Sequence, residues 1–245
     1  MVPKIIHYCW FGNNEMPNSV KMCIESWKKY CPNYKFILWS ENNYNINEAC
    51  EFVKKAYENK KWAFVTDYVR LDVVYRCGGI YLDTDVEILQ NMDILLDKGR
   101  GFFGFEQQSS INTGIGFACE KGETILEEMM EIYRNLEFNT EEMQKFACPI
   151  INTKVLQKHG LITNNKLQII NGIKILPTEF LCPENMFDGT ILYTEKTVSV
   201  HHYNASWMSK KEKALMKTIV KIKKILPQKM VVRLRKSISK MKIKK

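Results

Sequence analysis

The chain is organised around the stretch WAFVTDYVRLDVVYRCGGIYLDTDVE, residues 62–87. Apolar residues recur in its first part at the spacing of a largely buried helix, which Cys77 and the two glycines after it bring to an end. Asp67 and Arg70 lie three positions apart in this helix, so they should share one of its faces. The sequence therefore predicts a charged pair inside an otherwise apolar helix.

The segment after the glycines, IYLDTDVEI, is predicted to be a strand. Alternation along a strand would put Tyr81, Asp83 and Asp85 on one side of it. Carboxylates held so close together are costly to bury unless a cation lies among them. Oxygen ligands favour Mg²⁺ or Mn²⁺, and two carboxylates leave coordination positions open for substrate phosphates. A calcium-binding EF-hand is disfavoured, since its further loop acids and glycine are absent.

The complete pattern resembles the sugar-binding region of glycosyltransferase family 32 and, more distantly, the glucosylating domains of large clostridial toxins. In those families an Asp-x-x-Arg pair precedes Gly-Gly-x-Tyr-x-Asp-x-Asp at this spacing. The matching residues are Asp67, Arg70, Gly78, Gly79, Tyr81, Asp83 and Asp85.

The resemblance implies a metal-dependent hexosyltransferase with a single GT-A type α/β domain and a mixed central sheet, working in capsular or surface polysaccharide synthesis. Asp83 and Asp85 would hold Mn²⁺ or Mg²⁺ against the diphosphate of a UDP-hexose donor. Asp67 would bind sugar hydroxyls, Arg70 would orient the sugar or a phosphate oxygen, and Tyr81 would help to bind the donor. Transfer with retention at the anomeric carbon to a glycan or lipid-linked acceptor is also implied.

The N-terminal part alternates strand and helix, over residues 4–12, 18–30, 34–39 and 47–59, which predicts a Rossmann-like α/β sheet. Ligands gather at the carboxyl ends of such strands, so Trp10 and Phe11 should lie near the donor base, an interpretation that the resemblance strengthens. Glu41 and Asn42 follow the next strand and could reach a ribose, although turn chemistry alone also explains them. His7, within the first strand, is predicted to be a packed core residue.

Two later segments supply further candidates. Asn112 precedes a predicted strand over 115–119 among small residues, and the corresponding segment of the resembled families contacts the sugar; an ordinary glycine-rich hairpin is the alternative. In TVSVHHYNASW, residues 197–207, the two histidines should face opposite sides of a strand. By resemblance His202 is the first choice for a third metal or phosphate ligand, His201 is the second, and Ser206 and Trp207 would close over the donor.

Basic charge is confined to the C-terminal end. Residues 1–207 hold 21 Lys and Arg against 26 Asp and Glu, whereas residues 208–245 hold 15 against one. We therefore expect a catalytic domain over 1–207 and a tail of basic amphipathic helices over 208–245. Such a tail suits an anionic membrane surface. A tail packed on the domain is the alternative, and nucleic acid is disfavoured as a partner.

The eight cysteines are scattered among apolar residues without any Cys-x-x-Cys pair, which indicates reduced core thiols. No signal peptide or run of 18 apolar residues is evident. We expect a cytoplasmic protein, peripheral on the inner face of the cell membrane. The other function that fits the sequence is a membrane-surface binding module with a vestigial nucleotide site.

Overall fold

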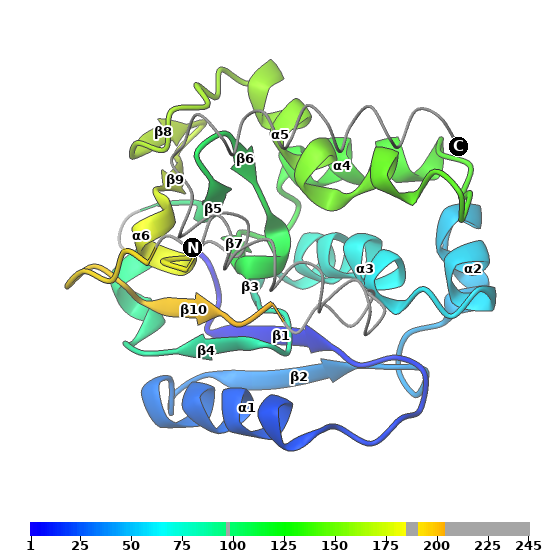
Figure 1. Cartoon of the computed structure of the whole chain (residues 1–245), viewed down its shortest axis with the longest axis horizontal. Coiled ribbons are helices and arrows are strands. Elements are labelled where there is room, and N and C mark those ends of the chain that lie inside the picture. Colours follow the sequence, from blue (N-terminus) through cyan, green and yellow to red (C-terminus); the bar gives the residue numbers. More distant parts are fainter. Residues whose placement is uncertain (97–98, 185–190, 204–245) are drawn as a thin grey trace, which may run out of the picture.

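The computed structural model describes residues 1–96, 99–184 and 191–203 (Figure 1). The strands are β1 (Ile5–Cys9), β2 (Lys35–Trp39), β3 (Gly79–Tyr81), β4 (Val86–Ile88), β5 (Gly101–Gln107), β6 (Ser110–Ile111), β7 (Phe117–Cys119), β8 (Gln168–Ile170), β9 (Ile173–Leu176) and β10 (Ser199–His201). The α-helices are α1 (Asn18–Tyr30), α2 (Glu51–Glu58), α3 (Trp62–Cys77), α4 (Thr124–Arg134), α5 (Cys148–Lys158) and α6 (Thr178–Leu181). Short 3₁₀ turns occupy Ile46–Glu48, Met92–Leu95, Thr113–Ile115 and Met143–Phe146.

The central sheet is mixed. Its main path runs β2-β1-β3-β7-β5-β9-β8, with β6 paired to β5. β1 is parallel to β2 and β3, and β5 is parallel to β9, whereas β7 runs antiparallel to both β3 and β5. β4 and β10 form a separate antiparallel pair beside it (Figure 1). The polypeptide thus leaves the parallel strands β1 and β3 at the same edge.

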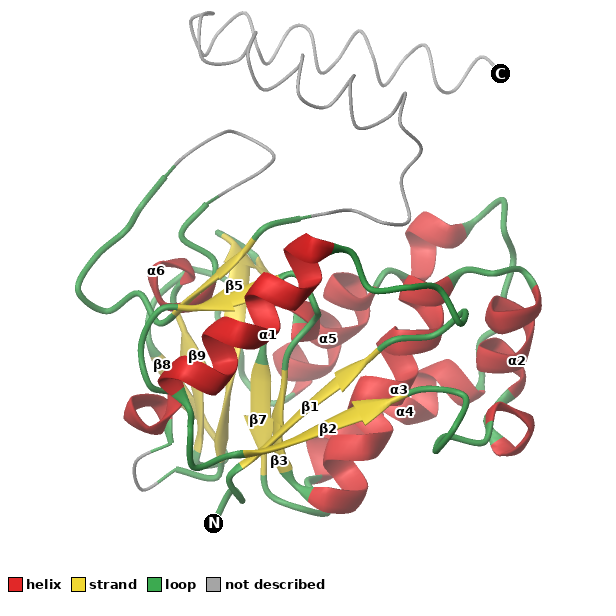
Figure 2. Ribbon diagram, turned by 90° about the horizontal axis from the view of Figure 1, so that it is seen from below, coloured by secondary structure: helices red, strands yellow, loops and turns green. Residues whose placement is uncertain are grey.

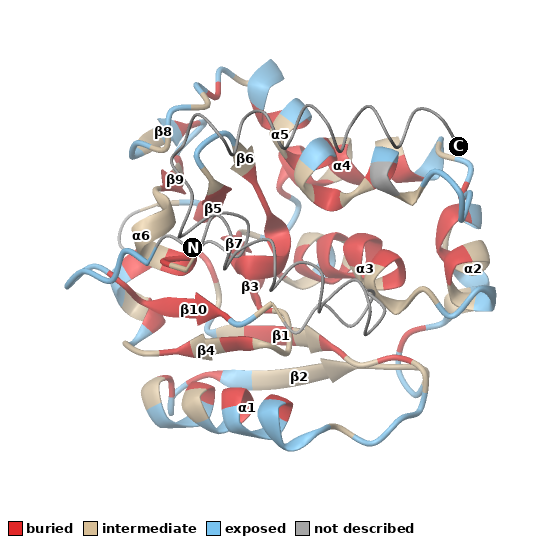
Figure 3. Ribbon diagram, in the orientation of Figure 1, coloured by how far each residue is buried: buried red, intermediate tan, exposed pale blue. Residues whose placement is uncertain are grey.

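Helices cover both faces of the sheet, α1 on one face and α3 and α4 on the other (Figure 2). Alternation along the strands explains the two layers, because Ile6 packs in the apolar cluster beneath α1 while Cys9 packs in the cluster beneath α3. Burial follows the same plan: the outer face of α1 is exposed, and α3 is buried along most of its length (Figure 3). Nine of the sixteen residues of α3 are buried, as its apolar sequence predicts.

The end of α3 is set by Gly78, whose φ is 68°. A Cβ at this position would stand 2.9 Å from the Lys121 backbone nitrogen, so a larger residue would collide with a neighbouring chain segment. The helix therefore stops here and passes directly into β3.

Three further sequence predictions can be compared with the fold. All eight cysteines lie in the described part of the chain and all are free, six of them buried. The described ranges include no helix with both the length and the apolar character needed to span a bilayer. The predicted tail over 208–245 lies outside the described residues, and so does the predicted domain boundary after residue 207.

Candidate active site

Helix α3 brings two opposite charges into the interior. The side chains of Asp67 and Arg70 share one helix face, as predicted, and Arg70 Nη1 lies 3.2 Å from Asp67 Oδ1. Asp67 is 7% exposed and Arg70 is 3% exposed, so neither charge is screened by water. Buried charges of this kind persist only when they are paired.

Arg70 also reaches across to the loop after β3. Its Nη2 lies 3.0 Å from Asp83 Oδ1, and the Tyr81 hydroxyl donates to the same oxygen at 2.9 Å. The guanidinium lies over the Tyr81 ring, 5.2 Å from its centroid. The buried Tyr81 therefore contacts Asp83 and Arg70, and these contacts fix the orientation of the Asp83 carboxylate.

The prediction of one continuous strand over residues 80–88 was wrong. β3 ends at Tyr81, a turn closed by a hydrogen bond from Val86 N to Asp83 O follows, and β4 then pairs with β10 outside the central sheet. The Asp83 N–H bonds to Gly114 O at 3.2 Å, which draws the segment away from the β3 direction. Asp83 and Asp85 therefore meet because a turn brings them together, and not through strand alternation.

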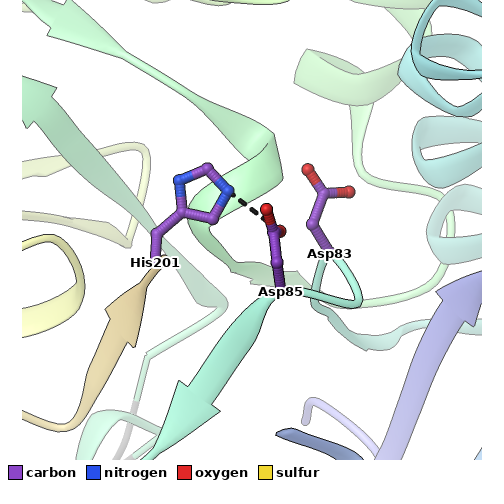
Figure 4. A group of neighbouring side chains, drawn as sticks. All are labelled: Asp83, Asp85 and His201. Atoms are coloured by element: carbon purple, nitrogen blue, oxygen red, sulfur yellow. Dashed lines mark ion pairs between the residues drawn. The ribbon is translucent and has the colours of Figure 1, made fainter. Parts of the chain in front are cut away.

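His201 of β10 completes the cluster. Its Nε2 lies 3.1 Å from Asp85 Oδ1, and ligand atoms of Asp83, Asp85 and His201 all lie within 4.8 Å of one another (Figure 4). The predicted order of the two histidines is reversed by this geometry. His202 lies beside Glu87, 2.8 Å from Nε2 to Oε2, because alternation along the strand turns it to the exposed side.

The electrostatics of the cluster favour a cation. Burial raises the pKa of Asp67 to about 6, against the opposing effect of Arg70, and burial likewise raises the pKa of Asp83. Burial alone would lower the pKa of His201, but the carboxylates of Asp85 and Asp83 outweigh it and raise that pKa. Two carboxylate oxygens and one imidazole nitrogen are a donor set that suits Mn²⁺ or Mg²⁺. The residues present therefore fit a divalent ion.

Asn112 lies at the edge of this cluster and is engaged by protein groups. Its Oδ1 accepts from Gly114 N at 2.6 Å and from Cys148 Sγ at 3.1 Å, and its Nδ2 donates to Glu106 Oε1 at 2.8 Å. Asn112 thus caps the 3₁₀ turn Thr113–Ile115 that touches Asp83. A contact with a sugar stays a prediction.

Two residues of this network were not selected from the sequence. Glu106 is a buried carboxyl at the end of β5, and burial raises its pKa. Cys148, the first residue of α5, contributes backbone and side-chain hydrogen bonds to Asp67. The signal for Glu106 was available, because GFFGFE is an apolar strand ending in a carboxylate at the edge where ligands gather.

The predicted base-binding residues after β1 differ from each other in burial. Phe11 is 4% exposed and packs edge to face on Tyr44, with ring centroids 6.3 Å apart, so it belongs to the core. Trp10 is only partly buried, and its Nε1 donates to Asn14 O at 2.7 Å.

Glu41 accepts the Gly12 N–H at 2.7 Å, which ties the ends of β1 and β2 together; its contact with a ribose stays a prediction. Ser206 and Trp207 lie outside the described residues.

Comparison with known proteins bears on this cluster directly. Residues 17–101 match the family model for the glycosyltransferase sugar-binding region containing a DXD motif, and this region includes Asp67, Arg70, Asp83 and Asp85. Inositol phosphoceramide mannosyltransferase 3 of Schizosaccharomyces pombe is 31% identical over 151 residues, covering 55% of this chain and 37% of that protein. An uncharacterized glycosyltransferase of Acanthamoeba polyphaga mimivirus is 22% identical over 84% of both chains.

The fold has a solved counterpart. The PaToxG glycosyltransferase superimposes with a TM-score of 0.52 at 18% identity, covering 64% of this chain and 69% of that chain. The predicted α/β fold of GT-A type with a mixed central sheet is confirmed. One region of the chain therefore matches the glycosyltransferase sugar-binding model, and its fold is similar to that of a solved glycosyltransferase. The chain spans little more than a third of the fission-yeast relative's length.

Proposed function

We propose that the chain is a metal-dependent hexosyltransferase that uses a nucleotide-sugar donor. The match of residues 17–101 to the sugar-binding model and the likeness of the fold to a solved glycosyltransferase support this proposal. The bond between the anomeric carbon and the diphosphate oxygen breaks, an acceptor hydroxyl oxygen takes the sugar, and the hydroxyl proton is released with the nucleoside diphosphate. The observation that carries the proposal is the convergence of Asp83, Asp85 and His201 beside the buried Asp67–Arg70 pair.

The residues divide the work by their contacts. Asp83, Asp85 and His201 would hold Mn²⁺ or Mg²⁺, which when bound supplies a Lewis acid for the leaving diphosphate. Arg70 fixes the Asp83 carboxylate by direct pairing. Asp67 is held by Arg70 and Cys148 and would present its remaining acceptor capacity to sugar hydroxyls.

Membership of family 32 and retention at the anomeric carbon belong to this proposal and rest on the residue pattern. The same pattern favours a UDP-hexose donor. A mannosyl donor is the second candidate, because the fission-yeast relative is named a mannosyltransferase. A panel of UDP- and GDP-hexoses varies both the base and the sugar of the donor, so it separates these two candidates.

A lipid-linked or glycan acceptor is proposed, and the name of the same relative, with its inositol phosphoceramide, favours a lipid. The basic segment 208–245 would bring the catalytic domain, residues 1–207, to an anionic membrane surface in the cytoplasm. Each Lys or Arg near such a surface adds about 1 kcal/mol of attraction. Capsular or surface polysaccharide synthesis is the setting that this arrangement suits.

The test is release of nucleoside diphosphate from UDP- and GDP-hexoses, with and without Mn²⁺. Native protein should hydrolyse one donor slowly in a metal-dependent reaction. Asp83→Ala should abolish that reaction because it removes a metal ligand, and Asp85→Asn should do so while keeping side-chain shape. Asp93→Asn is the control, since Asp93 is a partly exposed carboxylate that pairs with Lys4 and Tyr34 outside the site.

Either outcome is informative about the site. Loss of turnover in both site variants, with Asp93→Asn unaffected, would establish the reaction and name the sugar. Full activity of the Asp83 variant would contradict the metal site. Silence of native protein across the panel, with no donor binding by calorimetry, would favour the membrane-surface module instead.

A further inference from the structure

Glu106 occupies a position in the network that none of the proposed roles uses. It is 5% exposed at the carboxyl end of β5, and its Oε1 accepts a hydrogen bond from Asn112 Nδ2 at 2.8 Å. A buried carboxylate is costly unless neighbouring donors satisfy it. Its neighbours lead in two directions, and both directions end at the metal-binding cluster.

The first connection runs through the 3₁₀ turn Thr113–Ile115. Asn112 accepts the Gly114 N–H at 2.6 Å, and Gly114 O accepts the Asp83 N–H at 3.2 Å. A Cβ on Gly114 would stand 2.4 Å from Asp83 Oδ2, so turn and carboxylate are in close contact. Holding the Asn112 amide therefore holds the backbone against which Asp83 rests.

The second connection runs through Tyr203. The Glu106 carboxyl is hydrogen-bonded with the Tyr203 hydroxyl, which also lies 2.9 Å from Cys182 Sγ. The Tyr203 ring packs on His201 with centroids 4.2 Å apart. Fixing Tyr203 restricts the plane in which the imidazole can lie.

His201 needs such support, because only one of its ring nitrogens is engaged. Nε2 faces Asp85, while Nδ1 is on the other side of the ring, buried and without a hydrogen-bond partner among the described residues (Figure 4). Metal-binding histidines are normally oriented by a partner on the second nitrogen. In the described part of this chain, ring packing takes over that task.

We propose that Glu106 is the positioning residue of the metal site: through Asn112 it fixes the turn beneath Asp83, and through Tyr203 it fixes the ring of His201. This inference rests on the proposed metal-dependent function. Groups that orient metal ligands typically alter metal affinity about 10–100-fold when removed. Glu106 is not among the three residues whose ligand atoms lie within 4.8 Å of one another, so we assign it a positioning role and not that of a ligand.

The experiment is Mn²⁺ binding to the full chain without nucleotide, followed by electron paramagnetic resonance of free Mn²⁺. Glu106→Ala removes both connections and should weaken Mn²⁺ binding about 10–100-fold. Glu106→Gln keeps an acceptor for Asn112 and a polar group for Tyr203, so it should recover most of the affinity. Tyr203→Phe removes one hydroxyl only, which is a mild change for folding, and should weaken binding by a smaller factor than Glu106→Ala.

Glu123→Gln is the matched control. Glu123 is 1% exposed and pairs with Arg100 at 2.9 Å, away from the cluster, so this variant reports the cost of losing a buried carboxylate elsewhere. We expect it to lower thermal stability without changing Mn²⁺ affinity. A purely structural role for Glu106 would give its variants the same behaviour.

The outcomes separate this inference from the proposed function. Native Mn²⁺ affinity in folded Glu106→Ala, or in Tyr203→Phe should the alanine variant not fold, would overturn the positioning role. Equal losses in Glu106→Gln and Glu106→Ala would also overturn it, since charge and not hydrogen bonding would then be responsible. If native protein and Asp85→Asn bind Mn²⁺ equally weakly, the metal site itself fails, whatever the Glu106 variants do.

Discussion

His7 and His201 are both almost fully buried in strands, and yet their surroundings differ completely. His7, in β1, is 0% exposed; its Nδ1 accepts from Trp39 Nε1 at 3.0 Å and its Nε2 donates to Gly78 O at 2.9 Å. His201, in β10, is 8% exposed and faces Asp85 with one nitrogen, while the other has no hydrogen-bond partner within the described ranges. The sequence prediction that His7 is a packed core residue is confirmed.

The pKa values of His7 and His201 are shifted in opposite directions. Burial lowers the pKa of His7, only partly offset by its bond to Gly78, so the ring stays neutral and joins β1 to its neighbours. The carboxylates of Asp85 and Asp83 raise the pKa of His201 against the effect of burial. A histidine whose two ring nitrogens are both hydrogen-bonded therefore supports the fold. A histidine that lies among carboxylates with one unpartnered ring nitrogen is available to bind a ligand.

The largest difference in activity is expected between alanine substitutions at the two neighbouring histidines, His201 and His202. His201→Ala should lower metal-dependent turnover by about 100-fold or more, since loss of an outer-shell partner alone costs about 10–100-fold. His202→Ala should stay close to native, because the exposed His202 imidazole pairs with Glu87, outside the cluster. Steady-state rates at saturating Mn²⁺ check both; equal losses would mean that the two faces of β10 are not functionally distinct.

His7→Ala should act on stability instead. The change leaves the partly buried Trp39 N–H and the Gly78 carbonyl without their partner and creates a cavity, so the free energy of unfolding should fall by about 2–4 kcal/mol. Urea denaturation measures the loss. Turnover per folded molecule should remain native, and a drop in Mn²⁺ affinity would contradict the framework role.

The pH dependence of stability sharpens the contrast. The pKa of His7 is lower in the folded protein than in the unfolded chain, so the unfolded state takes up a proton first as pH falls below about 6.5. Its contribution to stability is therefore complete above that pH and is lost on acidification. His7→Gln, which can make the same two hydrogen bonds, should flatten the fall in unfolding free energy between pH 7 and 5 in urea titrations. An unchanged slope would mean that other groups dominate it.

The smallest effect is expected at Tyr133. Its hydroxyl is fully buried and, like Nδ1 of His201, has no hydrogen-bond partner among the residues that the structure describes. Tyr133→Phe removes an unsatisfied hydroxyl, so the free energy of unfolding should be unchanged or rise by about 1 kcal/mol in urea denaturation. A loss of more than that amount would show that the hydroxyl has a partner, such as ordered water.

Much of the fold follows from local sequence. The helix over 18–30 and the buried helix of residues 62–77 were predictable because apolar spacing and glycine stops are local signals. The mixed order of the sheet depends on how distant strands pair. No single segment of the sequence indicates that β7 lies between β3 and β5 and runs antiparallel to both.

The candidate site divides in the same way. Asp67, Arg70, Asp83 and Asp85 fall within nineteen residues, and their pattern is visible without a structure. The choice between His201 and His202 depended on which side of the β4–β10 pair lies toward Asp85, a tertiary fact. Glu106 could have been selected as the carboxylate that ends an apolar strand, but its link to the cluster could not, because Asn112 and Tyr203 follow it at sequence distances that no motif records.

Gly114 has a consequence for how this site would look in a substitution screen. It carries no functional group, and yet a single added carbon would stand 2.4 Å from Asp83 Oδ2 and 3.0 Å from Arg70 Nη1. Every replacement would displace the carboxylate, so the position would score with the acidic residues in any screen for activity. At Gly114, intolerance to substitution would reflect the space that the Asp83 side chain occupies. Such a screen would therefore count a residue without any catalytic group among the chemically essential positions.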